Sequence, residues 1–167
     1  MASPCKAVFQ KGIVNMHTKE TDLSEANERN RKIIEEFRAN EGRVGGRFEG
    51  KTLLLLHSKG ARSGKEHSNP AAYVRDNGNL VVIASKGGAP THPDWYYNLL
   101  ANPLVTVEVG TETFQARARI AEEPERTRLY KKMTEMLSSF ADYEKNTSRV
   151  IPVFVLTPVQ INLSAPL

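Results

Sequence analysis

Apolar and polar positions follow a helical spacing in the first part of the chain. Between residues 22 and 40, apolar side chains recur every three or four positions among charged ones, which predicts an amphipathic helix. Asp22 and Glu25 have the spacing of a capping box at its start, and Gly42 is placed to end it. The apolar face of this helix would consist of Leu23, Ala26, Ile33, Ile34 and Phe37.

From residue 52 onward the spacing changes to that of strands. Short apolar runs and alternating apolar and polar residues predict six strands separated by turn residues. The Asn77-Gly78 pair between the second and third strands is typical of a type I′ turn, so these two strands should be antiparallel neighbours. The predicted strands are 52–58, 70–75, 80–85, 105–109, 114–120 and 150–156.

Two further helices are predicted between these strands. One covers residues 95–101 and the other residues 124–137. Strands joined by hairpins, with helices at the corners, favour a mainly β, α+β fold in which about six antiparallel strands close into a barrel. Residues 42–158 should form this barrel domain, with an N-terminal segment at 1–41 and a tail at 159–167.

Length and composition limit the class of protein. A chain of 167 residues with 40% hydrophobic and 25% charged residues suits one globular domain. Apolar runs such as residues 53–56 are far shorter than the ~20 residues that cross a bilayer. Lys6 and Lys11 interrupt any apolar signal segment, and a single cysteine excludes an intrachain disulfide, so a cytoplasmic location is expected. Weak peripheral association with the inner face of a membrane is compatible with this expectation.

Positive charge is concentrated in one short stretch. The net charge of +4 does not predict a nucleic-acid partner, and the aromatic residues lie away from any basic stripe. Between residues 57 and 75 only Glu66 opposes four cations, which are Lys59, Arg62, Lys65 and Arg75. The turn at 60–65 combines glycines, a hydroxyl and cations, which together can bind a phosphate. A solvated hairpin turn with ordinary surface cations explains the same residues equally well.

A second candidate site follows the third predicted strand. Ser85 and Lys86 end that strand and two glycines follow, which exposes polar side chains and backbone donors at one end of the barrel. Trp95, the only tryptophan, opens the next helix with two tyrosines after it, so aromatic faces are available to a ring compound. The alternative is that Trp95 closes this end of the barrel as a core residue.

The segment at 138–149 is polar, with little periodicity, and is predicted to be a loop. Because it also carries Phe140 and Tyr143, it can act as a lid over a pocket or as a plain linker. No metal site is expected, because the histidines lack the spacing of metal ligands. Cys5 has no neighbouring histidine and is expected to be inert.

Three blocks of the sequence together resemble the deazaflavin-dependent nitroreductase family. They are residues 60–76 (GARSGKEHSNPAAYVRD), 84–103 (ASKGGAPTHPDWYYNLLANP) and 142–154 (DYEKNTSRVIPVF). The resemblance spans about residues 42–158, and the middle block is its most specific part. Members of this family are actinobacterial oxidoreductases with a split β-barrel, like that of FMN-binding proteins, and use coenzyme F-420, an 8-hydroxy-5-deazaflavin. The resemblance therefore implies an F-420-dependent reductase.

The resemblance also implies roles for individual residues. The phosphate and glutamate tail of the coenzyme are anionic, which suits the cations of the 60–65 turn. Ser85 would lie nearest the reacting carbon, and Ser85 or Tyr143 would stabilise charge on the acceptor as catalytic residues. Leu137, Phe140 and Tyr143 would wall the acceptor pocket. The residues implied to contact the coenzyme are Ala61, Arg62, Ser63, Lys65, His67, Ser68, Asn69, Pro70, Ile83, Ala84, Ser85, Lys86, Gly87, Asp94, Trp95, Tyr96, Tyr97, Asn98 and Phe140.

The chain departs from the family pattern in two places. Ala61 and His67 stand where the family usually has arginines, so the phosphate would be bound by other cations, namely Arg62, Lys65 and Lys86. Phe140 stands where some members have a tyrosine. The missing hydroxyl would affect the reduction of nitroimidazole-type compounds more than it would affect coenzyme binding.

The implied reaction is hydride transfer from the reduced deazaflavin to a small-molecule acceptor. The acceptor would be a quinone, an α,β-unsaturated lactone or ketone, or a nitroaromatic compound. Two alternatives remain open, namely a non-catalytic carrier or sensor of the deazaflavin and a flavin protein that uses FMN in the same architecture. The chain is expected to act as a monomer or a homodimer.

Overall fold

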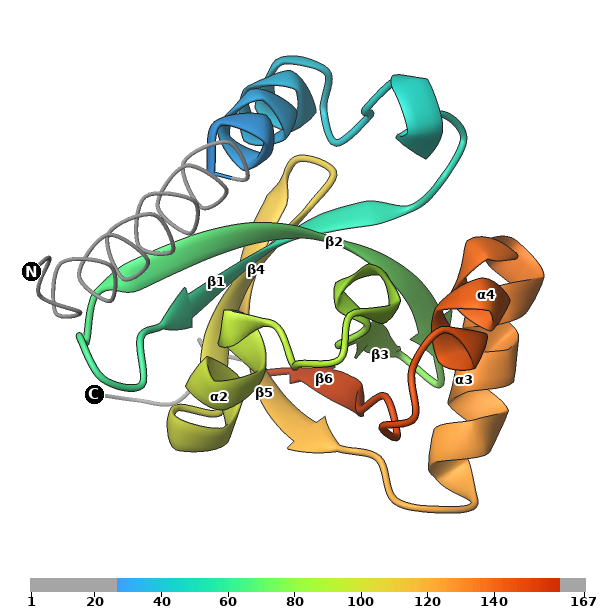
Figure 1. Cartoon of the computed structure of the whole chain (residues 1–167). Coiled ribbons are helices and arrows are strands. Elements are labelled where there is room, and N and C mark those ends of the chain that lie inside the picture. The colour runs from blue at the N-terminus through green and yellow to red at the C-terminus, as the bar shows by residue number, and fades with distance from the viewer. Residues whose placement is uncertain (1–26, 160–167) are drawn as a thin grey trace, which may run out of the picture.

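Six antiparallel strands form a closed barrel in the computed structural model, which describes residues 27–159 (Figure 1). The order of the strands around the barrel is β1-β2-β3-β6-β5-β4. The predicted mainly β barrel of about six antiparallel strands is therefore confirmed. The strands are β1 (Leu53–Lys59), β2 (Glu66–Asp76), β3 (Asn79–Ile83), β4 (Leu104–Val109), β5 (Glu112–Ile120) and β6 (Val153–Pro158).

Helices cover the barrel from several sides. Residues 27–39 form a helix that lies over the side of β1 and β4, and α2 (Asp94–Ala101) lies at one end of the barrel (Figure 1). Two helices, α3 (Glu125–Met136) and α4 (Ser139–Lys145), pack together on another side, near β3 (Figure 1). Within residues 27–159, no helix is both long enough and apolar enough to span a membrane.

The apolar run of β1 is buried on both faces of the barrel wall. Leu54 and Leu56 belong to the core inside the barrel, whereas Leu53 and Leu55 pack in a separate cluster with Phe37 of the helix 27–39. Burial of a leucine-sized side chain contributes ~1.5–3 kcal/mol. The helix 27–39 is therefore fixed on the outer face of β1 by apolar packing, and a strand covered on both faces appears in the sequence as a continuous apolar run.

The hairpin between β2 and β3 has the predicted turn. Asp76 and Asn79 face each other as the last paired residues of the two strands. Asn77 and Gly78 between them have φ angles of 49° and 81°. Positive φ at both central residues is the requirement of a type I′ turn, so this prediction is confirmed.

The first helix matches its prediction within the described residues. It covers residues 27–39, and the N–H of Gly42 donates to the carbonyl of Phe37 (2.7 Å) as the chain leaves the helix. This bond satisfies one of the carbonyls that a helix end leaves without an internal partner. The predicted capping residues Asp22 and Glu25 lie outside the described residues.

The loop predicted over residues 138–149 is wrong in its central part, which forms α4. Phe140 and Tyr143, three positions apart, contact each other with ring centroids 5.1 Å apart. Phe140 is only 8% exposed, and the hydroxyl of Tyr130 on α3 donates to its carbonyl (2.6 Å). Burial of these aromatic residues stabilises a helix of two turns, which is too short to produce a helical period in the sequence.

Candidate functional site

An open cleft of about 1460 Å³ lies between the helix 27–39, the chain from residue 60 to residue 69, and α2. Small-molecule pockets usually have volumes of ~300–1,000 Å³, so this cleft can admit an extended ligand. Many of the residues predicted to contact the coenzyme lie on its wall. They are Ala61, Arg62, Ser63, His67, Ser68, Asn69, Asp94, Tyr97 and Asn98.

Asn98 of α2 fixes the turn that forms one wall of the cleft. Its side chain is 7% exposed, and its Oδ1 accepts a hydrogen bond from the N–H of Ala61 (3.0 Å). Its Nδ2 donates to the Oγ of Ser58 (3.3 Å), and Asn102, one turn later, donates to the carbonyl of Lys59 (3.4 Å). The carboxamides of α2 therefore determine where the 60–65 turn sits.

The 60–65 turn is also closed by its own backbone. The N–H of Gly60 donates to the carbonyl of Lys65 (2.7 Å), and the N–H of Gly64 donates to the carbonyl of Gly60 (3.0 Å). A Cβ added at Gly60 would lie 2.5 Å from the Oγ of Ser63 and 3.0 Å from the Nε2 of His67. Two polar side chains thus converge over Gly60 at the edge of the cleft.

Positive charge at the cleft is available mainly on this turn. Within residues 27–159, Lys59, Arg62 and Lys65 make no ion pair. Of these three cations, Arg62 lines the cleft itself, and the two lysines lie beside it on the same hairpin. The other arginines of the cleft are already compensated, since Arg31 pairs with two glutamates of its own helix and Arg38 pairs with Glu108 (2.8 Å). An anionic group entering the cleft would therefore find its uncompensated partners at the turn.

A chain of polar contacts lies beneath the helix 27–39. Arg38 donates to Glu108 of β4, whose Oε2 lies 2.5 Å from the Nε2 of His57 on β1. The Nδ1 of His57 lies 2.7 Å from the Oγ of Ser68 on β2. The hydrogen bond from Arg38, and then that from His57, lower the pKa of Glu108 against the opposing effect of burial. No sequence pattern indicated a role for His57 or Glu108, because their contact joins two strands that are about 50 residues apart along the chain.

Arg149 fixes the segment that carries Ser85. Its guanidinium donates to the carbonyls of Ala84 (3.2 Å), Ser85 (2.8 Å) and Ala89 (2.9 Å). Ser85 itself is 7% exposed. Arg149 lies in the third block of the family resemblance, but no spacing rule indicates a partner that is some 60 residues earlier in the chain.

An aromatic cluster joins this segment to the cleft. The Nδ1 of His92 lies 3.0 Å from Nη1 of Arg149, and the His92 ring stacks on Tyr96 with centroids 4.1 Å apart. Burial, and then the nearby charge of Arg149, lower the pKa of His92, so its Nδ1 can accept from the guanidinium. Tyr96 contacts Tyr97, which is 51% exposed and lies on the cleft wall.

The predicted catalytic residues Ser85 and Tyr143 come from segments in contact. The short turn of residues 86–88 packs closely against α4. A Cβ added at Gly88 would lie only 3.0 Å from the carbonyl oxygen of Tyr143. Gly88 has a φ of 82°, so both its backbone angle and its contact with α4 require glycine. The catalytic roles of Ser85 and Tyr143 toward an acceptor stay predictions.

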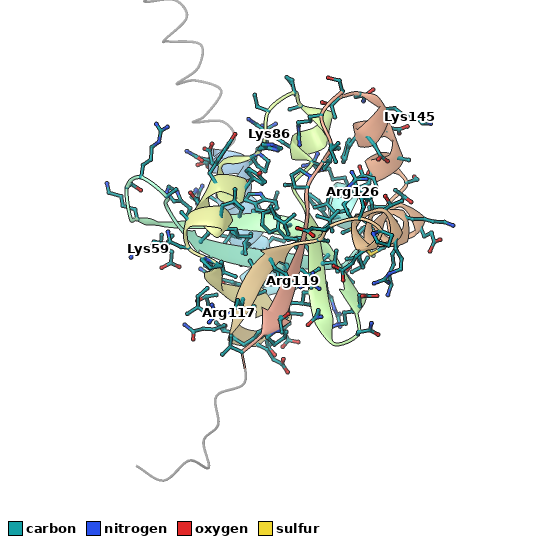
Figure 2. The ribbon with its side chains drawn as sticks, turned by 90° about the horizontal axis from the view of Figure 1, so that it is seen from below. Lys59, Lys86, Arg117, Arg119, Arg126 and Lys145 are labelled. Atoms are coloured by element: carbon teal, nitrogen blue, oxygen red, sulfur yellow. The ribbon has the colours of Figure 1, made fainter. Side chains whose placement is uncertain are left out.

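Several other predicted contacts do not lie on the cleft wall. Trp95 is 8% exposed and packs on Phe154 inside the barrel. This is the core position that sequence analysis gave as the alternative to a ring contact. The Nζ of Lys86 donates to Thr91 (3.2 Å), and Lys86 and Lys59 project from different parts of the surface (Figure 2). The residues outside the wall are Lys65, Pro70, Ile83, Ala84, Ser85, Lys86, Gly87, Trp95, Tyr96 and Phe140. Their contact with a coenzyme stays a prediction.

Comparison with known proteins gives consistent matches over most of the chain. A family model described as F420H(2)-dependent quinone reductase matches residues 29–158. An F420H(2)-dependent quinone reductase of Mycobacterium tuberculosis is 38% identical over 125 residues, which cover 72% of this chain and 84% of that protein.

Two solved structures are similar to this chain in both sequence and fold. The structure of an F420-H2 dependent reductase is 40% identical, with a TM-score of 0.58 and coverage of 62% of this chain and 92% of that one. Another structure, described as a domain-swapped dimer, is 34% identical, with a TM-score of 0.60 and coverage of 81% of this chain and 98% of that one.

Proposed function

The chain belongs to the F420H(2)-dependent quinone reductase family, and we propose that it reduces a quinone with hydride from reduced coenzyme F-420. One observation carries the assignment of the coenzyme site. Nine residues predicted to contact the coenzyme line a single cleft, beside a turn whose cations make no ion pair among the described residues. Unsaturated lactones, unsaturated ketones and nitroaromatic compounds are further candidate acceptors.

The residues of the cleft fit an anionic coenzyme. Arg62 can pair with a phosphate or carboxylate, and the Oγ of Ser63 lies at the same edge of the cleft. The cleft continues along α2 past Tyr97, so a long tail and a ring system can lie in it at the same time. Glu35 of the helix 27–39 and Asp94 of α2, which lie on the other walls of the cleft, would keep an anion toward the turn.

The segment of Ser85 would present the reactive end of the site. When bound in its reduced form, the coenzyme supplies a hydride from the carbon that replaces N5 of a flavin. Arg149 holds the carbonyls of Ala84 and Ser85, which keeps the Ser85 side chain in one position. Ser85, or Tyr143 on the adjoining α4, would then orient the acceptor and stabilise negative charge on its oxygen. Close packing around these residues would also exclude water.

The test separates this function from its two alternatives. Coenzyme F-420 and FMN are titrated separately against the protein, and reduced F-420 is then mixed with menadione while its absorbance is followed. We expect saturable binding of F-420, weaker or absent binding of FMN, and rapid oxidation of reduced F-420 that depends on menadione. Preference for FMN would contradict the coenzyme, and binding without turnover over a broad panel of acceptors would favour a carrier or sensor.

A charge-matched pair of variants tests the position of the coenzyme. Arg62→Gln removes a cation from the cleft, whereas Arg117→Gln removes one from the exposed face of β5 (Figure 2). We expect Arg62→Gln to weaken F-420 binding by about tenfold or more, because a charge-assisted contact contributes ~1.5–3 kcal/mol. Equal affinities of the two variants would contradict the proposed position.

The proposal also covers the type of acceptor and the oligomeric state of the chain. We propose that the partner is a small molecule and that the chain acts as a monomer or homodimer. A related structure is described as a domain-swapped dimer, which makes the dimer the first state to examine. Light scattering of the purified chain, with and without F-420, distinguishes the two states.

A further inference from the structure

His57 is a buried histidine whose two ring nitrogens both have partners. It is 8% exposed and lies on the outer face of β1, on the same side as Leu55 under the helix 27–39. Its Nε2 lies 2.5 Å from Oε2 of Glu108, and its Nδ1 lies 2.7 Å from Oγ of Ser68. Ser68 also lines the cleft, so His57 reaches a bound ligand only through that hydroxyl.

The charge of His57 determines the direction of its hydrogen bond with Ser68. Glu108, whose pKa is lowered, is ionised near neutral pH and can only accept, so Nε2 must carry a proton. Nδ1 of the neutral ring then has no proton, and Ser68 must donate its hydroxyl proton to it. When Nδ1 takes a proton from solvent, it becomes the donor instead, and the hydroxyl proton of Ser68 is released to point elsewhere.

Charged groups surround His57 on three elements. Glu108 faces it from β4, and Glu66 faces it from β2 with an oxygen 3.5 Å from Nδ1. Arg38 of the helix 27–39 acts on it through Glu108. Glu66 and Glu108 are therefore the charged groups in direct contact with the ring.

We infer that His57 is a positioning residue that controls whether Ser68 donates into the cleft, so that an anionic ligand binds there with uptake of a proton by His57. The inference rests on the proposed function for the identity of that ligand, the phosphate-bearing coenzyme. An anion beside Ser68 needs a donor, and only the protonated state of His57 leaves the Ser68 proton free to bond it. The protonated ring should therefore bind the anion more tightly than the neutral ring does.

Calorimetry of F-420 binding in buffers of different ionisation enthalpy counts the protons that the complex takes up. We expect net uptake of protons on binding, and an affinity that falls with rising pH by at most about tenfold per pH unit, which is the limit for one linked proton. His57→Gln and Ser68→Ala should each abolish the uptake, while His67→Gln, which alters the other histidine of the cleft, should keep it. If His57→Gln does not fold, Ser68→Ala decides the question.

Three results would overturn the inference: binding without proton uptake, uptake that persists in Ser68→Ala, or uptake that is lost only in His67→Gln. A failure of the wild-type chain to bind F-420 would contradict the proposed function instead. In that case the ¹⁵N shifts of the His57 ring are followed while sulfate, which does not titrate near neutral pH, is added. Protonation of His57 on addition of sulfate supports the inference, and an unchanged neutral ring contradicts it.

Discussion

Replacement of Arg149 by methionine should loosen the segment that carries Ser85. The guanidinium makes two short hydrogen bonds to carbonyls, of Ser85 (2.8 Å) and Ala89 (2.9 Å), and two longer ones to that of Ala84 (3.2 and 3.3 Å). It also lies 3.0 Å from Nδ1 of His92. A hydrogen bond from a charged donor contributes ~1.5–3 kcal/mol, and bonds that share one side chain are not additive. Arg149 is also partly exposed, so we count the short pair and expect a loss of ~3 kcal/mol. For a domain of this size that lowers Tm by about 6–12 °C.

The assay combines thermal unfolding, followed by circular dichroism, with turnover of reduced F-420 and menadione. Arg149→Met should also lower kcat/KM by about tenfold or more, because a displacement of the reactive segment by a fraction of an ångström misplaces Ser85. Arg149→Lys keeps the charge and can reach one carbonyl, so it should recover part of both losses. Arg117→Met, on the exposed face of β5, serves as the control. Unchanged Tm and kcat/KM in Arg149→Met would show that Arg149 does not hold the segment of Ser85 in place.

Three further substitutions test other parts of the structure. Gly88→Ala should lower Tm and reductase activity together, because the new methyl group would lie 3.0 Å from the carbonyl of Tyr143 at a φ of 82°; a variant as stable as wild type would refute that contact. Hydrogen bonds from two cations of α3 lower the pKa of Asp76 to about 2. Asp76→Asn should therefore lower the free energy of unfolding by ~1 kcal/mol at neutral pH. Because the folded-state pKa lies below the unfolded value of 3.8, urea unfolding should show this difference fully above about pH 4 and lose it as pH falls toward 2. Asn98→Ala should lower the free energy of unfolding by ~2–3 kcal/mol and weaken F-420 binding, since it leaves the N–H of Ala61 without its partner. Normal F-420 affinity would show that the position of the 60–65 turn does not depend on α2.

The sequence predicted the elements that depend on local chemistry. The Asn77-Gly78 pair sets its own turn geometry, and the strand after it follows from its run of β-branched residues. The start of β2 was predicted four residues late, at Pro70 rather than Glu66. Pairing of Glu66 with Lys59 across the hairpin extends the strand through residues that look like a turn in the sequence. Tertiary pairing, rather than propensity, determines that boundary.

The candidate site was only partly accessible from the sequence. The 60–65 turn and the family were identified from contiguous motifs, and the family match confirms the second. The supports of the site were missed, because Arg149 and Asn98 act through contacts with residues 37–65 positions away along the chain. Sequence analysis left two roles open for Trp95, a contact with the ring of the coenzyme and closure of one end of the barrel. The structure shows it packed in the barrel core with 8% exposed, and its contact with the coenzyme stays a prediction. Such contacts depend on how the barrel closes, which no local pattern encodes.

A crystal structure of the chain with F-420 would show where the coenzyme binds. We expect the coenzyme phosphate within hydrogen-bond distance of Arg62 and the 60–65 turn, with the deazaflavin ring extending along α2 toward Ser85. Coenzyme bound away from the cleft formed by helix 27–39, the turn and α2, or with its phosphate remote from Arg62, would contradict the account.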